Sequence, residues 1–538
     1  MKRLFTSKVW VTACAVAVMT TALGAQQGQQ AGPAAAPPLQ AQQADRYVVG
    51  QAKPPEVAGS PVIELSLEQA TQIALENNLD LAVQKMNPQL QDYNLVIAQA
   101  AFRPTVNGSF NGNHSSQTST SLLEGVTTSN ISISQSQAYN MSVNQTLPWY
   151  GGRVTASFNN GRNANNNINS TRNPSFSSST NIQYSQPILQ GFKIDGTRNN
   201  LRTQSIQRQI TDLQLQNQVE TVKANVRVAY WALRGAIESI EIGNRALQLA
   251  QQTDRDNKTK VDIGVLAPID TTQSEVSVAN AQQALLNAQI QWTTAELNLK
   301  RLLVASSDDD LYKKTINPID QPNISVQSVD IPAAVKEALA NRSDIVQQVK
   351  NMEMSRLNLE VTKNSTLPQL NATGSYQISG TGGPTLAHGV TTSEGNYFDA
   401  FRNIWTFNTP TWSAGLTFQY PIGMVSAKAS YARAQIQYQQ SEAQLKSLQL
   451  NLYADVTNAG LAVQNAYLRY LASQKSRDAQ EKNTAATQTR FDNGMSTPFE
   501  VATAIQNLTT ARLAELNAII SYLNALADFE RKQRVGGS

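Results

Sequence analysis

The chain has 538 residues, only 15% of them charged, and a net charge of +4 that is spread along its length. This composition excludes a basic nucleic-acid-binding stripe and a solvating acidic tail. Length alone allows three or four ordinary domains, but the duplication described below favours two closely packed halves of one body.

The first 25 residues predict a secretory signal peptide, because a basic start precedes an apolar run that ends in small residues near Gly24 and Ala25. The only cysteine, Cys14, lies in this segment, so the mature chain would form no disulfide of its own. A lipidated Cys14 is disfavoured because Lys8 leaves too short an apolar run before it. Residues 26–60 are rich in Gln, Ala and Pro and predict a disordered segment.

After the signal segment, no apolar stretch approaches the roughly 20 residues of a helical membrane span. This pattern excludes a helical span, and a membrane role would need a barrel.

The sequence is internally duplicated. Residues 67–107 align without a gap with residues 331–371, at an offset of 264 positions. The matched pairs are Ala70/Ala334, Ala74/Ala338, Leu75/Leu339, Asn77/Asn341, Asp80/Asp344, Pro104/Pro368 and Asn107/Asn371. A second register, offset by 230, relates Asp262–Pro268 to Asp492–Pro498. We therefore expect a first repeat at 61–303, a connecting segment at 304–330, a second repeat at 331–533 and a tail at 534–538.

Each repeat predicts a short helix, strands, a very long helix, a tight turn and a second short helix. The expected helices are 67–103, 194–262 and 268–303, then 331–367, 424–491 and 498–533. The long ones, of about 68 residues, would each rise about 100 Å. Two short helices placed end to end match the length of one long helix. We therefore expect an antiparallel two-stranded coiled coil in each half.

Strict heptads of small and large residues mark the seam of this coiled coil, whereas a generic amphipathic helix would drift toward a period of 3.6. The small positions are Ser274, Ala281, Ala288 and Ala295, then Ala504, Ala511, Ala518 and Ala525. The large positions are Val278, Leu285, Trp292 and Leu299, then Leu508, Glu515, Tyr522 and Phe529, where Glu515 is polar.

Between the helices, six segments of about ten residues alternate between apolar and polar side chains. Their apolar positions include Val106 and Phe110, Tyr139 and Val143, Val154 and Phe158, Ile182 and Tyr184, Leu370 and Tyr376, and Trp412 and Phe418. Such strands fit one tilted bilayer crossing each, although a half-buried soluble sandwich gives the same alternation. The signal peptide and the Asn-, Ser-, Thr- and Gly-rich loops at 113–137, 161–177 and 380–409 favour the membrane alternative.

Four of these strands fall in the first half and two in the second, so the first half carries an extra hairpin that turns at 148–152. Six strands cannot close a useful pore alone, and lipid does not tolerate exposed sheet edges. The chain is therefore expected to assemble with copies of itself.

Several motifs, in this order and twice over, resemble the TolC-like outer-membrane efflux protein family across nearly all of the chain after about residue 60. They are Leu65-Ser-Leu-Glu-Gln-Ala70 with Ala74-Leu-Glu-Asn-Asn78, the strand-opening Pro104 and Pro368, the strand–helix junctions Gln186–Gly191 and Tyr420–Gly423, and the glycine turns at Gly264 and Gly494. The junction residues of interest are Pro104, Pro187, Gly191, Pro368, Pro421 and Gly423.

The resemblance implies an α+β membrane protein of TolC-like fold, in which a long antiparallel coiled-coil α-barrel joins an outer-membrane β-barrel completed by trimerisation. A homotrimer with a helical tunnel in the periplasm would export small molecules or proteins, as part of a tripartite efflux pump or a type I secretion system. Its partners would be a periplasmic adaptor, an inner-membrane transporter and outer-membrane lipid. Family members usually contribute four strands per chain, and six would make eighteen per trimer and a wider outer mouth. If the extra hairpin folds outside the barrel, the usual twelve remain.

The resemblance also implies that the helix turns meet the adaptor and close the tunnel. The corresponding residues are Lys260, Gly264, Leu266 and Pro268 in the first turn and Arg490, Gly494, Thr497 and Pro498 in the second. Asp270 and Glu500 match the family's tip carboxylates, and three copies would form a ring that favours cations. An acid in the first turn of a helix is also favoured by the helix dipole alone.

The resemblance implies that Asp270, Glu500 and Thr503 form the constriction at the tip of the tunnel. Thr503 stands where the family often carries a second carboxylate, and Ser496 where it carries an arginine. These departures argue against a gate locked by such a pair. Lys260 and Arg490 precede the turn glycines by four positions and would face either an adaptor or, preferably, the last carbonyls of their own helices.

The sequence contains no constellation of nucleophile, base and metal ligands, so no enzymatic activity, metal or cofactor is expected. The aspartates 308–310 predict a solvated loop, and His114 and His388 lie in loops without ligand-like companions. The leading hypothesis is an export duct that performs no chemistry. The alternative is a secreted coiled-coil adhesin or structural stalk, which fractionation into medium or outer membrane would separate from it.

Overall fold

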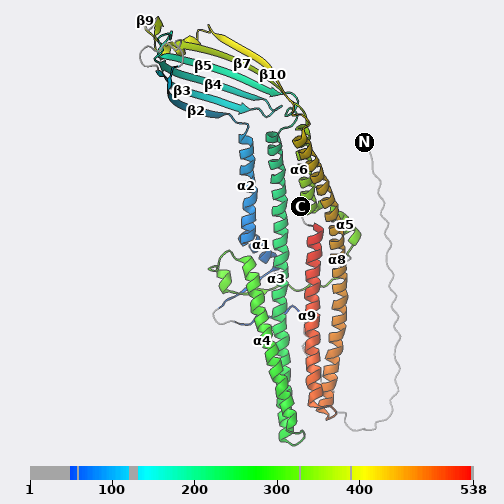
Figure 1. Ribbon diagram of the computed structural model, residues 1–538. Helices are drawn as coiled ribbons and strands as arrows, with labels where there is room; N and C mark the ends of the chain where they lie inside the picture. The colour runs from blue at the N-terminus through cyan, green and yellow to red at the C-terminus, as the bar shows by residue number, and fades with distance from the viewer. Residues whose placement is uncertain (1–48, 57–59, 120–130, 326–328, 388–389, 535–538) are drawn as a thin grey trace, which may run out of the picture. The chain divides into compact units, whose positions relative to one another are not determined.

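The computed structural model describes residues 49–56, 60–119, 131–325, 329–387 and 390–534 (Figure 1). The predicted signal peptide, most of the predicted disordered segment and His388 lie outside these residues. The described part of the chain from residue 49 onward clusters as one compact unit.

The helices of the two halves repeat in the same order, which confirms the duplicated plan (Figure 1). The first half holds α1 (Leu67–Asn77), α2 (Leu79–Ala100), α3 (Gly196–Asp262) and α4 (Ile269–Leu303). The second half holds α5 (Ile331–Asn341), α6 (Ser343–Asn364), α8 (Val425–Asp492) and α9 (Pro498–Arg534).

The first helix of each half is broken, so the prediction of single helices at 67–103 and 331–367 is wrong in both places. The breaks fall at Asn78 and Arg342, whose backbones are extended. Asn78 ends α1 and begins α2, and its side-chain oxygen accepts a hydrogen bond from the Leu81 amide at 3.0 Å. Asparagine is among the best N-cap residues, so this local bond stabilises a new helix start where periodicity alone predicts continuity.

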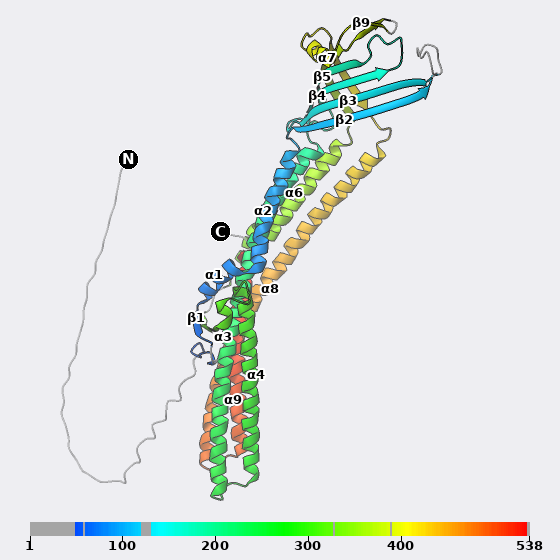
Figure 2. The same ribbon diagram turned by 90° about the vertical axis from the view of Figure 1, so that its left-hand side faces the viewer.

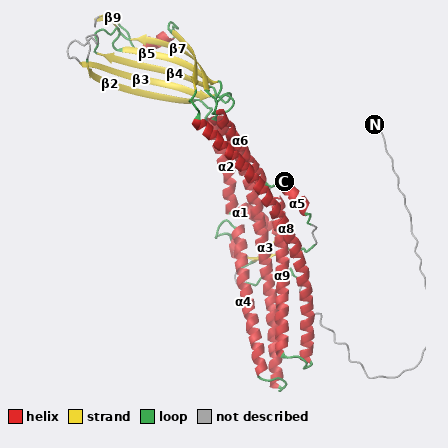
Figure 3. Cartoon of the chain, turned by 45° about the vertical axis from the view of Figure 1, so that its right-hand side comes forward, coloured by secondary structure: helices red, strands yellow, loops and turns green. Residues whose placement is uncertain are grey.

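The long helix α3 is the central element of the helical part, because α2, α4, α6 and α9 all pack against it (Figure 3). The other long helix, α8, packs against α5, α6 and α9. The predicted heptad seam is confirmed: every one of its positions in α4 and α9 is buried or half-buried. The largest apolar cluster surrounds the middle of α3, at Tyr230, Leu233 and Ile237, and a second lies between α5, α8 and α9.

The six predicted strands form one antiparallel sheet. They are β2 (Thr105–Thr118), β3 (Ile131–Thr146), β4 (Arg153–Asn165), β5 (Ser175–Pro187), β7 (Gln369–Gly382) and β10 (Pro410–Gln419). Their order in the sheet is β10-β7-β5-β4-β3-β2 (Figure 1). The extra hairpin β3–β4 therefore lies inside the continuous sheet, and β2 and β10 are its two edges.

The register gives the sheet one apolar and one polar face. On one face, Met141 lies opposite Phe158, and Ile182 opposite Tyr376, which in turn lies opposite Trp412. On the other face, the neighbouring positions pair Ser142 with Ser157, Asn181 with Gln377, and Ser375 with Ser413. The predicted alternation is thus continued across all six strands rather than within each strand alone.

The segment predicted as a polar loop at 380–409 contains a small subdomain, which corrects that prediction. It holds the hairpin β8 (Thr385–Ala387) and β9 (Val390–Ser393), and the helix α7 (Tyr397–Ile404). α7 packs against β5 and β7 (Figure 2). Its start is fixed by a capping box between Asn396 and Asp399, a local signal that the surrounding Gly, Ser and Thr residues obscure.

Residues 49–56 are described and packed, although the sequence predicts disorder there. The Glu238 carboxylate accepts hydrogen bonds from the amides of Gly50 at 2.7 Å and Ala52 at 3.3 Å. Arg234, paired with Glu238 at 2.9 Å, donates to the Ala52 carbonyl at 3.2 Å. The backbone of this segment binds a buried ion pair. Because backbone bonds hold it, its composition does not reveal that it is ordered.

The connection between the halves also contains structure. β6 (Thr315–Pro318) pairs in parallel with β1 (Val62–Leu65), and a short 3₁₀ helix, η2 (Asp310–Lys313), precedes it. Asp309 caps η2 through a bond from the Leu311 amide at 2.9 Å, while Asp308 and Asp310 are exposed. None of the helices in the described residues combines the length and apolar composition of a membrane span.

Candidate functional site

The two long helices end in the same backbone turn. Gly264 and Gly494 have φ angles of 78° and 74°, and the residue after each donates to the carbonyl of Lys260 or Arg490 at 2.8 Å. A Cβ placed on either glycine would meet nothing within 4 Å. Glycine is required here for its positive φ and not for space.

A carboxylate in the first turn of each following helix binds an amide of the preceding turn. Asp270 Oδ2 accepts from the Ala267 amide at 3.2 Å, and Glu500 Oε2 accepts from the Thr497 amide at 3.2 Å. Pro268 and Pro498 stand at the starts of α4 and α9, where the missing amide is no loss. Within one chain, both predicted tip carboxylates therefore stabilise the starts of their own helices.

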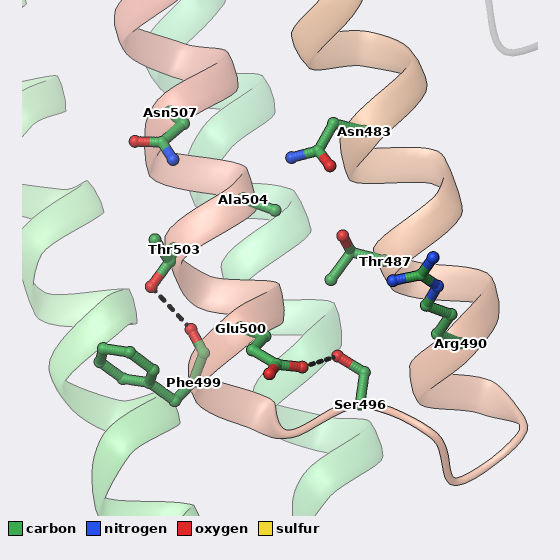
Figure 4. Close-up of a pocket in the computed structure, with 9 residues that line it drawn as sticks. All are labelled: Asn483, Thr487, Arg490, Ser496, Phe499, Glu500, Thr503, Ala504 and Asn507. Atoms are coloured by element: carbon green, nitrogen blue, oxygen red, sulfur yellow. Dashed lines mark hydrogen bonds between the residues drawn. The ribbon is translucent and has the colours of Figure 1, made fainter.

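The second tip carries a shallow pocket of about 270 Å³ that the view in Figure 4 shows between α8 and α9. Its lining residues are Asn483, Thr487, Arg490, Ser496, Phe499, Glu500, Thr503, Ala504 and Asn507. Its polar character comes from one anionic and one cationic side chain among hydroxyls and amides.

Glu500 is the charged centre of this pocket. The Ser496 hydroxyl donates a hydrogen bond to its carboxylate, as the dashed line in Figure 4 marks. This bond, the Thr497 amide and the charge of Arg490 together hold the pKa of Glu500 below its ordinary value. Glu500 is therefore ionised throughout the neutral range.

Thr503 lies one turn further along α9, in the same pocket as Glu500. Its hydroxyl donates to the Phe499 carbonyl of its own helix at 2.8 Å (Figure 4). Asp270 belongs to the other tip, so the pocket brings together two of the three predicted constriction residues.

Lys260 does not bind the last carbonyls of its own helix, which corrects the preferred prediction. Its Nζ lies 3.5 Å from the Phe491 carbonyl oxygen of α8 and 3.6 Å from the centre of the Phe491 ring. Leu266 packs against the same apolar cluster, which contains Phe491, Val501 and Ile505. These contacts join the two tips. The heptad pattern could not predict them, because a heptad describes packing within one half and these contacts form between the halves.

Arg490, the counterpart of Lys260 in the second repeat, lines the pocket beside Glu500 and is exposed. The cations at the equivalent positions of the repeat therefore have different surroundings. Lys260 connects the two tips, whereas Arg490 faces a polar hollow.

The strand–helix junctions are where the predicted prolines and glycines place them. Pro104 and Pro368 immediately precede β2 and β7, and Pro187 ends β5. Pro421 follows β10 at one residue's distance, and Gly423 has a φ of 80°.

Gly191 ties the two halves together at these junctions. It has a φ of 87°, and its amide donates to Asn364 Oδ1 at 2.6 Å. Its carbonyl accepts from Arg198 at 2.5 Å, and Arg198 is held by Asp195 at 2.6 Å. Sequence reasoning missed Asn364, Asp195 and Arg198, since isolated polar residues carry no periodic signal.

A larger hollow of about 540 Å³ lies between α3, α4 and α9. Small side chains such as Gly243, Ala250 and Ala281 form its walls, and Thr503 reaches it from the tip. Ala281 and Ala288 of the heptad seam line it, although the seam predicted close helix packing and no hollow. Among the described residues, no group of three or more His, Cys, Asp or Glu side chains could hold a metal ion.

A family model for outer membrane efflux proteins matches residues 70–304 and 334–531, which covers both halves. The chain belongs to the outer membrane efflux protein family. The match leaves out the first 69 residues and the connection between the halves, and it includes both tips and all six strands of the sheet. The family places the chain in the outer membrane.

One curated relative of the chain is Toxin and drug export protein A of Aggregatibacter actinomycetemcomitans, which is 23% identical over 317 residues. That match covers 59% of this chain, and the chain spans 62% of the relative's length.

Solved outer-membrane channels share the fold. The CmeC outer membrane channel of Campylobacter jejuni superimposes with a TM-score of 0.63 at 17% identity, over 87% of this chain and 86% of CmeC. CusC gives a TM-score of 0.65 at 16% identity, over 90% of this chain and 95% of CusC. At these identities the likeness describes the fold, and it agrees with the predicted TolC-like architecture.

Proposed function

We propose that this outer membrane efflux protein is the outer-membrane channel of a tripartite export system. The observation that carries the proposal is the joining of one six-stranded sheet, apolar on one face and polar on the other, to a duplicated bundle of very long helices. In a closed barrel, the apolar face meets lipid and the polar face lines a wet lumen. The helices extend that lumen through the periplasm.

The channel is a homotrimer in this proposal, because one chain leaves both edges of its sheet unpaired. β2 runs from α2 away from the helices, and β10 runs back toward α8, so β10 of one copy lies antiparallel to β2 of the next. Three sheets of six strands make a wall of eighteen. Barrels of about 16 to 18 strands enclose an aqueous channel, so this mouth is wider than the twelve strands usual in the family.

The exposed faces of the helices support the same assembly. Large apolar side chains of α8 are exposed in the single chain, among them Ile436, Leu450, Tyr453 and Leu468. Neighbouring copies would cover them, since several large apolar side chains exposed along one helix favour an interface.

The helix tips would meet a periplasmic adaptor, which connects the channel to an inner-membrane transporter. Large apolar side chains are exposed at both tips, namely Ile263 and Val265 in the first and Met495 and Phe499 in the second. An apolar partner surface accounts for them better than water does. The transporter supplies the energy, and small molecules or proteins pass outward through the channel.

Glu500 would form a ring of three negative charges around the tunnel axis, with Thr503 beside it. Its lowered pKa supports this role, since the ring stays ionised at neutral pH. A ring of carboxylates favours cations and repels anions. Selectivity then rests on pore width and ring charge, with no chemical step on the cargo and no cofactor.

Single-channel recording in planar lipid bilayers tests the proposal. Purified protein should insert and produce stepwise conductance, and Glu500→Gln should reduce cation preference while conductance remains. Protein that remains soluble, or that binds the bilayer without conducting, contradicts a channel. A coiled-coil stalk would be recovered in the medium on fractionation instead of in the outer membrane.

A further inference from the structure

The short helix α7 lies on the apolar face of the sheet. It packs on three strands, at Phe158 and Asn160 of β4, Phe176 of β5, and Gly380 and Gly382 of β7, and Ser178 of β5 donates a hydrogen bond to Asn160 beside it. The register makes Asn160 the neighbour of Ser178, and Ser178 the neighbour of Gly380. All six continue the side of the sheet that carries Ile182 and Tyr376, because side chains alternate along each strand.

The contact is close and specific. A Cβ on Gly380 would lie 2.1 Å from the Ala400 carbonyl oxygen, and one on Gly382 would lie 2.5 Å from the Asn396 carbonyl oxygen. The Tyr397 hydroxyl donates to Asn160 Oδ1 at 2.8 Å, and Asn403 donates to the Thr381 carbonyl at 2.9 Å. Two glycines and these bonds hold α7 flat on the sheet.

The height of α7 on the sheet places it at the outer edge of the apolar band. The band on β7 begins at Leu370, next to the helices, and α7 covers the strand from Ile378, which is buried and lies level with Phe158, to Gly382. The rise from Leu370 is about 26 Å to Ile378 and about 40 Å to Gly382, at about 3.3 Å per residue. With a strand tilt of about 40°, these heights are about 20 Å and about 30 Å, so α7 lies across the outer edge of an apolar band about 25 Å tall.

One edge of α7 is aromatic, and its middle ring, Phe401, also contacts Phe158 of the sheet. Phe398, Phe401 and Trp405 recur at helical spacing, and their rings contact one another at 6.1 and 6.4 Å between centroids. Phe398 is 64% exposed and Trp405 is 67% exposed, while Ala400 and Ile404 are buried on the sheet. Asp399 and Asn403 lie on the opposite edge of the helix, so one edge is apolar and the other polar.

We infer that α7 is a membrane-interface anchor, in which Phe398, Phe401 and Trp405 insert into the boundary between headgroups and acyl chains of the outer leaflet. The occupant of this surface is lipid, because the aromatic stripe continues the apolar face that the sheet presents to the bilayer. This inference rests on the proposed barrel. A second aromatic group at the helix end of the sheet, with Trp149, Tyr150 and Tyr420 exposed, marks the other boundary.

Quenching by brominated lipid tests the anchor and the barrel separately. The full-length protein is reconstituted into phosphatidylcholine vesicles brominated either near the carbonyl end or near the methyl end of the acyl chains. The parent is compared with Trp405→Phe and Trp412→Phe; Trp412 lies on the apolar face of the edge strand β10. Both residues are exposed, so neither change opens a cavity in the core.

Trp405→Phe should remove a fraction of the fluorescence that bromine near the carbonyl end quenches more strongly than bromine near the methyl end. Trp412→Phe should remove quenched fluorescence as well. If Trp405→Phe leaves quenching unchanged while Trp412→Phe lowers it, the sheet is in lipid and the anchor is refuted. If neither change alters quenching, the sheet is not in lipid and the proposed function fails with it.

The paired variants Phe398→Ser with Trp405→Ser and Phe398→Leu with Trp405→Phe add a second measurement. The serine pair should weaken retention of the protein in vesicles on mild detergent extraction at least several-fold, and the apolar pair should retain parental behaviour. Equal extraction of both pairs would show that the aromatic stripe has no role in lipid.

Discussion

The two long helices, α3 and α8, have the same place in the repeat and nearly the same length, yet a single chain covers them unequally. α3 has 19 buried residues and α8 has 10. α3 is surrounded by helices of both halves, whereas α8 turns apolar side chains such as Leu450 to the outside. The difference shows which part of the wall one chain completes and which part needs a neighbouring copy.

The largest effect is expected from a substitution in α3, the better covered of the two long helices. Glu238→Gln leaves Arg234 buried in α3 without its carboxylate partner and replaces the charged acceptor that holds residues 49–56 by a neutral amide oxygen. Loss of one member of a buried ion pair costs about 3–5 kcal/mol. The free energy of unfolding, measured by denaturant titration of the helical circular dichroism signal, should fall by that amount.

Glu241→Gln is the matched control on the same helix. Its pair with Arg245, at 2.7 Å, is half-exposed, so the loss should be under about 1 kcal/mol. Similar losses in the two variants would show that the buried pair in α3 contributes no more than a surface pair.

Two leucines of α8 separate folding from assembly. Leu452 is 1% exposed in the core and Leu450 is 73% exposed in the single chain. Leu452→Ala should destabilise the subunit by about 2–5 kcal/mol. Leu450→Ala should leave the subunit stable and shift the mass in sedimentation from trimer toward monomer. If the trimer is unaltered by Leu450→Ala and also by Leu450→Glu, no neighbouring copy covers this face of α8.

Substitutions of the turn glycines compare the two helix tips directly, because Gly264 and Gly494 have the same backbone conformation. Gly264→Ala and Gly494→Ala should each cost about 1 kcal/mol, because both positions require positive φ and neither is crowded. Asparagine at the same positions should cost less, since it tolerates this conformation. Thermal unfolding measures the shift, and clearly unequal losses at the two tips would contradict their common backbone.

The smallest expected effect is a pH dependence at the second tip. The folded-state pKa of Glu500 is lowered, so its stabilising contribution is complete above the ordinary value of 4.5 and is lost as pH falls through the lower folded value. Cation preference in bilayers should decline over the same acidic window. Glu500→Gln should show a low preference that is independent of pH, and a parental preference that persists through that window would exclude Glu500 as the source.

Periodic features of the chain were predictable and local or cross-half contacts were not. The heptads that contain Ala288 and Trp292, and the alternation that contains Ile182 and Tyr376, gave the helix seam and both faces of the sheet, because each pattern repeats many times. The backbone of both tips followed from a glycine and a proline at fixed spacing. In contrast, a single side-chain bond at Asn78 ends a helix against its periodicity.

The candidate site was predicted in part for the same reason. Glu500 and Thr503 were predicted from the resemblance to the family, through the tip positions that they match, and the pocket contains both. The contact of Lys260 with Phe491 joins residues 231 positions apart, which no local pattern encodes. α7 was missed because its eight residues lie between glycine-, serine- and threonine-rich stretches, where a short amphipathic helix has too few turns to show a period.

Electron cryomicroscopy of the detergent-solubilised assembly tests the central claim most directly, because the strands and the subunits can be counted together. The account expects three chains, with β10 of each paired to β2 of the next in a continuous wall of eighteen strands, and with α8 covered by a neighbouring copy. A wall of twelve strands with the β3–β4 hairpin outside it would contradict the six-strand contribution. A single chain with both sheet edges free would contradict the channel itself.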